Sequence, residues 1–272
     1  GQSGALALEN PACPSLLEAC RLPPRPEDFV GRRMALCDIL RHFDSIGEGL
    51  GRRACVVSGP EGIGKTAVAI ELAHFASSPG RLFSRSVVFV SLQGRPELVR
   101  VLGAMADCLH PALPDFVAQP RAPEPGHARA QLLHAFQHLD RQKGRCLLVL
   151  DDGAGAVQAN SDVRCLLSSL LEVTQRLCIA AFSRERVYES LGSCKCVNLQ
   201  LPALSGLESA QLFLKRIHRP LRPCDLVRGA QGNGAVPCSE GLLSELTSHP
   251  LLCQLGGNPG CVRAASQRVT PE

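Results

Sequence analysis

The stretch GPEGIGKT at residues 59–66 constrains this chain more than any other feature. It lies between an apolar run, ACVVS at 54–58, and a segment with helical spacing of apolar residues. Gly59 and Gly64 can adopt positive φ, which turns successive backbone N–H groups inward around an anion. A helix that begins at Lys65 directs its positive end at the same point. The sequence therefore predicts a phosphate-binding loop that joins a strand to a helix.

The end of this loop fits a nucleotide polyphosphate with a divalent cation. Lys65 would place its positive charge on the β- and γ-phosphates, and Thr66 would offer its hydroxyl to Mg²⁺. The alternative interpretation is a glycine-rich turn that contains a lysine by chance. The nucleotide-binding residues predicted for the loop are Gly59, Pro60, Glu61, Gly62, Ile63, Gly64, Lys65, Thr66 and Ala67.

Apolar runs alternate with helix-like segments over most of the chain. The predicted strands are 54–58, 86–92, 146–152, 177–183 and 194–201. The predicted helices between them are 65–77, 96–109, 126–141 and 162–173. Uninterrupted apolar strands separated by helices are typical of a parallel sheet that is covered on both faces. We therefore predict an α/β fold with a five-stranded parallel sheet flanked by helices, and ligands at the carboxyl ends of the strands.

The same patterns divide the chain into three parts. Residues 1–28 are rich in proline and are predicted to be irregular, and 29–204 form the nucleotide-binding domain. From 205 to 272 the strands stop and a small helical domain is predicted. Within the larger part, the segment 111–126 contains five prolines and no apolar periodicity, so we expect a flexible excursion between helices.

The predicted helical domain begins with a capping signal and ends with short helices. Ser205 is followed three residues later by Glu208, which is the pattern of a capping box. A glycine-rich loop at 228–237 then precedes two short helices at 239–248 and 258–269.

Charged side chains follow two of the predicted strands. The run CLLVLDD delivers Asp151, which would hold Mg²⁺ directly or through water, and Asp152, which would orient or deprotonate an attacking water. The alternative for Asp152 is that Asp152-Gly153 simply makes a turn. The run LCIAAFSR ends in Arg184, which would contact a γ-phosphate or else remain a solvated arginine at a strand end. The predicted catalytic residues are Lys65, Asp151, Asp152 and Arg184, and the predicted metal ligands are Thr66 and Asp151.

The composition indicates which partners and which cellular compartment to expect. The net charge is +4 without basic blocks, and the chain has no Trp and one Tyr, so nucleic acid is not the expected partner. No long uncharged apolar run and no secretory signal are present, so no membrane association is expected. The 14 Cys include no C-x-x-C pair, and Cys55, Cys146 and Cys178 fall inside apolar runs. We predict reduced, buried thiols in a cytoplasmic protein.

Two histidines, His134 and His138, lie one helical turn apart, a spacing at which two ligands could hold zinc. No third ligand is apparent in the sequence and there is no H-E-x-x-H motif, so a polar helix face is the preferred interpretation.

Taken in order, these pieces resemble the signal-transduction ATPases with numerous domains (STAND), and within them the NB-ARC group of apoptosome and plant resistance proteins. The resemblance extends from residue 29 to 268 and includes FVGRR, the phosphate loop, CLLVLDD, AAFSR, LPALSGLESAQLFLKRI and LGGNPGCV. It implies that Val30, Gly31 and Arg32 lie near the base and that Pro259 contacts adenine, with Pro250 as a rival. It also implies ATP or ADP with Mg²⁺ as cofactors.

The chain departs from the family's pattern at three points. Gly153 replaces the usual apolar residue after the aspartates, and the sensor strand ends in Phe-Ser-Arg instead of Thr-Thr-Arg. The chain also ends before the family's winged-helix domain and its phosphate-contacting histidine. We therefore expect the family's lock on ADP to be incomplete in this chain.

The resemblance implies a signalling switch that ADP closes and ATP opens for self-association, with slow Mg²⁺-dependent hydrolysis. We expect a homo-oligomer in the active state and protein partners that act through flanking domains. One alternative is a scaffold that binds nucleotide without cycling. A DNA-loading ATPase is a third hypothesis, which would require a basic DNA surface.

Overall fold

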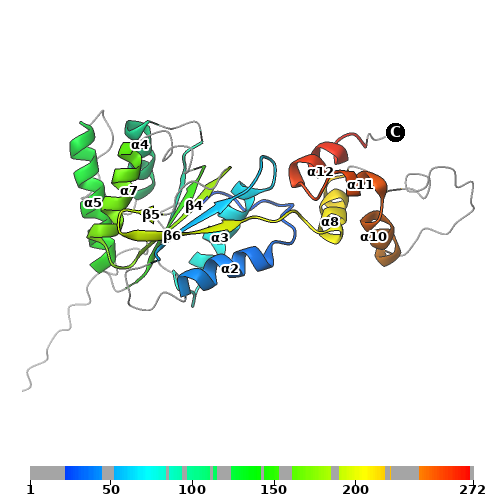
Figure 1. Ribbon diagram of the computed structural model, residues 1–272, viewed down its shortest axis with the longest axis horizontal. Helices are drawn as coiled ribbons and strands as arrows, with labels where there is room; N and C mark the ends of the chain where they lie inside the picture. Colours follow the sequence, from blue (N-terminus) through cyan, green and yellow to red (C-terminus); the bar gives the residue numbers. More distant parts are fainter. Residues whose placement is uncertain are drawn as a thin grey trace, which may run out of the picture.

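A computed structural model gives the architecture of the chain (Figure 1). The structure describes residues 22–44, 52–83, 86–93, 97–110, 113–114, 124–141, 144–152, 161–184, 190–217, 221 and 239–269. Most of the predicted irregular segment 1–28, most of the excursion 111–126, the loop 228–237 and Gly153 lie outside these residues.

The fold is an α/β fold built on a six-stranded, mostly parallel sheet in the order β2-β3-β4-β1-β6-β5. The strands are β1 (Ala54–Ser58), β2 (Val87–Ser91), β3 (Cys146–Asp151), β4 (Leu177–Ser183), β5 (Ser190–Leu191) and β6 (Cys194–Gln200). The predicted count of five strands is wrong because β5 was missed. This strand has two residues and pairs antiparallel with β6, so it is too short to produce a period in the sequence.

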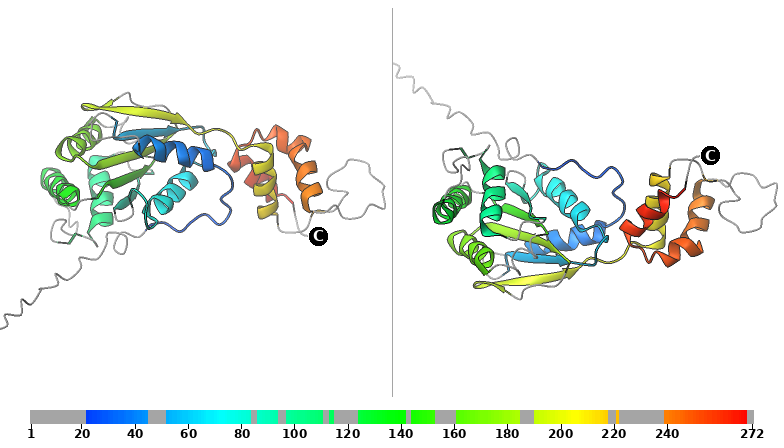
Figure 2. Two further views of the ribbon diagram at one scale, coloured as in Figure 1. Left: turned by 90° about the horizontal axis from the view of Figure 1, so that it is seen from below. Right: turned by 90° about the horizontal axis from the view of Figure 1, so that it is seen from above.

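Helices cover both faces of the sheet (Figures 1 and 2). Side chains of β1 alternate between two apolar cores, with Val56 in one and Val57 in the other. The first core includes helices α4 (Leu98–Leu109), α5 (Pro125–Arg141) and α7 (Ser161–Val173). The second includes α2 (Arg33–Asp44) and α3 (Lys65–Ser77). Because both faces are buried, the central strands can be apolar at every position, and this explains why they were predictable.

Beyond the sheet, four helices form a group that has its own apolar core: α8 (Gly206–Arg216), α10 (Ser239–Thr247), α11 (Pro250–Gln254) and α12 (Pro259–Ser266). We call these helices the helical group. Figure 1 shows the group at one end of the molecule, where the chain reaches it from the end of β6. The predicted capping box is confirmed: the Glu208 N–H donates to Ser205 Oγ at 3.2 Å, and the Ser205 N–H donates to Glu208 Oε2 at 2.8 Å. Helix α11 was not predicted, since five residues are too few to show helical spacing.

The predicted burial of Cys55, Cys146 and Cys178 is confirmed, although Cys37 and Cys165 are exposed. All ten described cysteines are free thiols. No described helix is both long enough and apolar enough to cross a membrane.

Candidate functional site: a phosphate loop in a cleft

The phosphate loop (residues 59–66) leaves β1 and enters α3, as predicted. Positive φ occurs at Gly62 (77°) and Gly64 (93°) but not at Gly59, which corrects the expectation for that residue. At Gly59 the absence of a side chain matters for another reason, because an added Cβ would lie 3.0 Å from Ile63 Cγ2. Gly64 also precedes α3 without a side-chain cap, which leaves the first N–H groups of the helix directed at the loop.

Lys65 folds over the loop. Its Nζ donates to Gly59 O at 2.7 Å and to Pro60 O at 2.8 Å. Burial lowers the pKa of the Lys65 ammonium, and the nearby Arg184 guanidinium lowers it further. The lysine is therefore held at the loop that it is predicted to serve.

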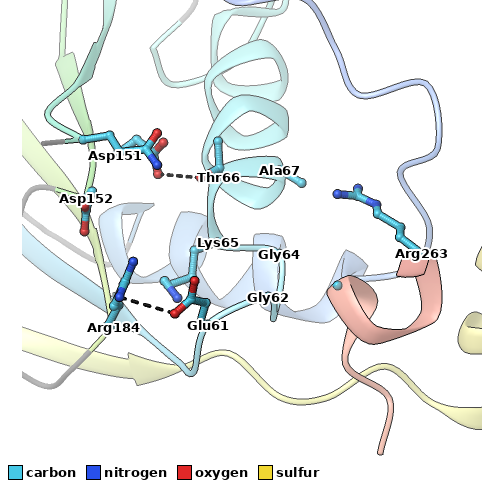
Figure 3. Close-up of a pocket in the computed structure, with 12 residues that line it drawn as sticks. Glu61, Gly62, Gly64, Lys65, Thr66, Ala67, Asp151, Asp152, Arg184 and Arg263 are labelled. Atoms are coloured by element: carbon cyan, nitrogen blue, oxygen red, sulfur yellow. Dashed lines mark hydrogen bonds and ion pairs between the residues drawn. The ribbon is translucent and has the colours of Figure 1, made fainter. Parts of the chain in front are cut away.

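Thr66 and Asp151 bring two oxygens together at the carboxyl end of the sheet. Thr66 Oγ1 donates to Asp151 Oδ1 at 3.1 Å, and Figure 3 shows this contact between the start of α3 and the end of β3. Asp151 is buried, and burial raises the pKa of its carboxyl despite the hydrogen bond from Thr66. A carboxylate and a hydroxyl are hard oxygen donors of the kind that Mg²⁺ prefers. The described residues contain no cluster of three or more His, Cys, Asp or Glu that could hold a metal.

Asp152 and Arg184 reach the same edge of the sheet. Asp152 lies in a turn with a φ of 58°, and its side chain lines the cleft. The alternative of an Asp152-Gly153 turn includes Gly153, which lies outside the described residues. Arg184 Nη1 lies 3.4 Å from Glu61 Oε2, and both side chains are largely exposed. Figure 3 shows this ion pair across the mouth of the loop.

These side chains surround a cleft of about 290 Å³, which we call the phosphate cleft. It is lined by Glu61, Gly62, Gly64, Lys65, Thr66, Ala67, Gln93, Asp151, Asp152, Arg184, Gly260 and Arg263. All four predicted catalytic residues are among them. Gln93, Gly260 and Arg263 were not predicted. Gln93 directly follows a predicted strand, as Arg184 does, and Arg263 lies one helical turn after Pro259, so the sequence contained a signal for both positions.

A family comparison agrees with this geometry. The model of the AAA ATPase domain matches residues 28–180, which include the phosphate loop and β3. The chain belongs to the AAA ATPase domain family. No curated protein sequence matches the chain.

Solved structures share the fold of this AAA ATPase domain. The Aeropyrum pernix ORC1 protein in complex with DNA is 19% identical with a TM-score of 0.56, covering 89% of this chain and 61% of that one. The ADP form of the A. pernix ORC2 protein is 17% identical with a TM-score of 0.55, covering 91% and 64%. A STAND protein with a tetratricopeptide repeat sensor from Pyrococcus horikoshii is 18% identical, covering 71% and 26%, but its TM-score of 0.42 carries no weight. At these identities the likeness concerns the fold alone.

A second cavity lies beside the phosphate cleft of the AAA ATPase domain. Val30, Arg32 and Pro259, which were predicted to lie near the base, all line it. Its volume is about 20 Å³, roughly the space that one water molecule occupies, so a purine would have to displace its lining. Gly31 is not among its lining residues. It has a φ of 67°, and an added Cβ would overlap the Glu208 carboxylate.

The rival proline, Pro250, does not lie in either cavity. It occupies the first turn of α11 and is exposed. Pro259 is buried at the first position of α12, and among the described residues it is the proline that the structure brings to the second cavity. Its contact with adenine stays a prediction.

The helical group touches the phosphate loop directly through the first turn of α12. Asn258 Nδ2 donates to Glu61 O at 2.9 Å, and the Gly260 N–H donates to Gly62 O at 2.9 Å. Only glycine fits at position 260 without displacement, because an added Cβ would lie 3.0 Å from Gly62 Cα. Asn258 also caps α12, since its Oδ1 accepts from the Gly260 and Cys261 N–H groups.

Arg32 makes further hydrogen bonds between the phosphate loop and the helical group. Its guanidinium donates to Ile63 O in the loop at 2.8 Å and to Pro202 O in the connection to α8. Its backbone N–H donates to Glu208 Oε1 at 3.3 Å. Arg32 is buried, has a φ of 62°, and has a guanidinium pKa that burial lowers. A single residue therefore ties the segment before α2 to both the loop and the helical group.

Proposed function

We propose that this AAA ATPase domain is the nucleotide-binding module of a signalling switch of the STAND class, similar to the NB-ARC group. ADP favours the arrangement in which the helical group docks on the phosphate loop. ATP favours an open form that associates with other copies of the chain. A nucleotide shifts such an equilibrium only by its difference in affinity for the two forms.

The observation that carries this proposal is the pair of hydrogen bonds from Asn258 and Gly260 to the carbonyls of Glu61 and Gly62. These bonds join the helical group to backbone atoms of the same loop that is predicted to bind phosphate. Any ligand that moves the loop therefore changes the docking of α12. We accordingly propose residues 29–204 and 205–272 as two domains, preceded by an irregular segment at 1–28.

The residues present fit ATP or ADP with Mg²⁺. Thr66 and Asp151 supply the oxygens that would hold the ion, which would neutralise phosphate charge when bound. Lys65 would exchange its contacts with Gly59 O and Pro60 O for phosphate oxygens. Asp152 would orient or accept a proton from water, and Arg184 would contact the terminal phosphate.

We propose slow hydrolysis. The Arg184 side chain is largely exposed and lies 3.4 Å from Glu61, so the cation that would contact the terminal phosphate is not fixed in position. Domains of this type that lack a well-placed stabilising arginine turn over slowly. Slow hydrolysis would keep the ATP-bound form long enough for it to associate with further copies of the chain and with protein partners. We propose that this takes place in the cytoplasm.

The alternative of a scaffold that binds nucleotide without cycling uses the same site. Incubation of the purified protein with Mg·ATP, followed by denaturation and chromatography of the released nucleotide, separates the two. Accumulation of bound ADP supports the switch, whereas intact ATP after long incubation supports the scaffold.

The likeness in fold to the ORC1 protein in complex with DNA motivates one further candidate, a DNA-loading ATPase. Binding of duplex DNA that weakens steeply with salt would support it. We rank this candidate lower because the charge of the chain is mild.

The proposed function is tested by Lys65→Ala, with Lys195→Ala as the matched control because Lys195 is exposed on β6. We expect the affinity for Mg·ADP, measured by titration calorimetry, to fall about 100-fold or more in Lys65→Ala because a charged contact to phosphate is lost. Lys195→Ala should bind like the wild type. Normal nucleotide affinity in a folded Lys65→Ala protein would contradict the assignment of the site.

A further inference from the structure

Asp28 connects three segments that are distant in the sequence. It precedes α2, and its carboxylate accepts from Arg216 Nε at the end of α8 at 2.6 Å. It also accepts from Arg263 of α12, at 2.9 Å from Nε and 3.3 Å from Nη2. The Asp28 side chain is only 8% exposed, whereas the two arginines are 42% and 36% exposed.

The carboxylate stays ionised in this position. Burial alone would raise the pKa of Asp28, but the hydrogen bonds and charges of Arg216 and Arg263 hold it below its usual range. The hydrogen bond that Arg216 donates to Asp28 in turn raises the pKa of Arg216. One buried negative charge is therefore shared by two guanidinium groups on two helices of the helical group.

Arg263 differs from Arg216 in what else it faces. It lines the phosphate cleft and the second cavity as well, whereas Arg216 lines neither. In Figure 3 the Arg263 side chain extends from α12 toward Ala67, next to the beginning of α3. The cation thus lies between a fixed internal carboxylate and a cleft built for anions.

We propose that Asp28 competes with the phosphate groups of a bound nucleotide for Arg263, and that this competition couples the cleft to the docking of the helical group. This inference rests on the proposed function. When Arg263 is drawn toward an anion in the cleft, Asp28 keeps only Arg216, and the tie between α12 and the segment before α2 weakens. When the cleft holds less negative charge, Arg263 pairs with Asp28 again, and the contact between α12 and the segment before α2 re-forms.

Competition and simple positioning of Arg263 predict opposite changes in nucleotide affinity for Asp28→Asn. If Asp28 merely held Arg263 in place for nucleotide, Asp28→Asn would weaken nucleotide binding. Under competition, Asp28→Asn frees Arg263, so the affinity for a non-hydrolysable Mg·ATP analogue, whose additional phosphate competes for this arginine, should rise by about five- to tenfold even though the free protein becomes less stable. Arg263→Gln should lower the same affinity by about tenfold, since it removes a cation from the cleft.

Arg216→Gln is the matched variant, because it breaks the same cluster without altering the cleft. Asp28 would then hold Arg263 alone and more firmly, so the affinity for the Mg·ATP analogue should fall by about two- to threefold. This variant also keeps the proposal testable if Asp28→Asn does not fold, because a role in positioning predicts no change for Arg216→Gln.

The experiment is titration calorimetry of the non-hydrolysable Mg·ATP analogue with the wild type, the three single variants and the Asp28→Asn/Arg263→Gln double variant. Thermal unfolding of each free protein serves as a folding control. We expect the gain from Asp28→Asn to disappear in the Arg263→Gln background, which a double-mutant cycle measures directly. Weaker binding by Asp28→Asn, or an unchanged Arg216→Gln, would overturn the competition while leaving the proposed function intact. Failure of the wild type itself to bind the Mg·ATP analogue would overturn the proposed function.

Discussion

At the scale of single residues, Asp151 is needed for the predicted metal site but lowers the stability of the fold. Because burial raises the pKa of its carboxyl, the native state binds this proton more tightly than the unfolded chain does. The carboxylate therefore destabilises the fold increasingly as the pH rises through the raised pKa. The free energy of unfolding is therefore lower because the fold keeps a buried negative charge where a cation would bind.

We accordingly predict that Asp151→Asn raises the free energy of unfolding at pH 7 by about 1 kcal/mol while weakening the binding of Mg·nucleotide. The amide oxygen can still accept from Thr66 Oγ1, so the local hydrogen bond is kept. Denaturant unfolding at several pH values measures the effect. The gain should vanish below about pH 4, where Asp151 is protonated in both states. A loss of stability at pH 7 would contradict this view of the carboxylate.

At the scale of elements, α12 combines a capped helix with a contact to the phosphate loop, and the two can be separated. Asn258→Ala and Ser205→Ala each remove one helix cap, so each should lower the free energy of unfolding by about 1 kcal/mol. Only Asn258 also donates to Glu61 O in the loop.

Because ADP is proposed to favour the docked arrangement, we predict that Asn258→Ala lowers the affinity for Mg·ADP by about threefold or more. Ser205→Ala should leave this affinity nearly unchanged. Thermal unfolding and calorimetry on both variants measure the two effects. Equal nucleotide affinities in the two variants would show that the contact between α12 and the loop does not communicate with the site.

The elements also show which parts of the structure were predictable. Strands β1, β3 and β4 were predictable because they are buried on both faces, and the residues at their carboxyl ends followed from the parallel arrangement. Strand β5 and helix α11 were not, because two and five residues do not establish a period. The positions of Asp151 and Arg184 needed only strand ends and charge.

Contacts through backbone atoms could not be predicted. Arg32 donates to two carbonyl oxygens, and Gly260 donates its N–H to Gly62 O. Every residue has a carbonyl, so no side-chain pattern in the sequence marks which one accepts. The resemblance pointed to Arg32 and Pro259, but the pairing of Asp28 with Arg263 joins positions 235 residues apart and has no local signal.

At the scale of the whole molecule, the proposed switch requires the position of the helical group to depend on the bound nucleotide. In this structure the group is fastened at three places: Asn258 and Gly260 on the phosphate loop, Arg32 at Ile63 and Pro202, and Asp28 between Arg216 and Arg263. Each is a small number of polar contacts. Such an arrangement can be released by a difference of a few kcal/mol in binding free energy.

The most direct test is amide hydrogen exchange across 258–266 and the phosphate loop, measured with saturating Mg·ADP and then with a non-hydrolysable ATP analogue. Lys65→Ala serves as the control that should not respond to either nucleotide. We expect protection of α12 with ADP and exchange at least about tenfold faster in α12 with the ATP analogue. Equal protection of α12 with both nucleotides would contradict the switch.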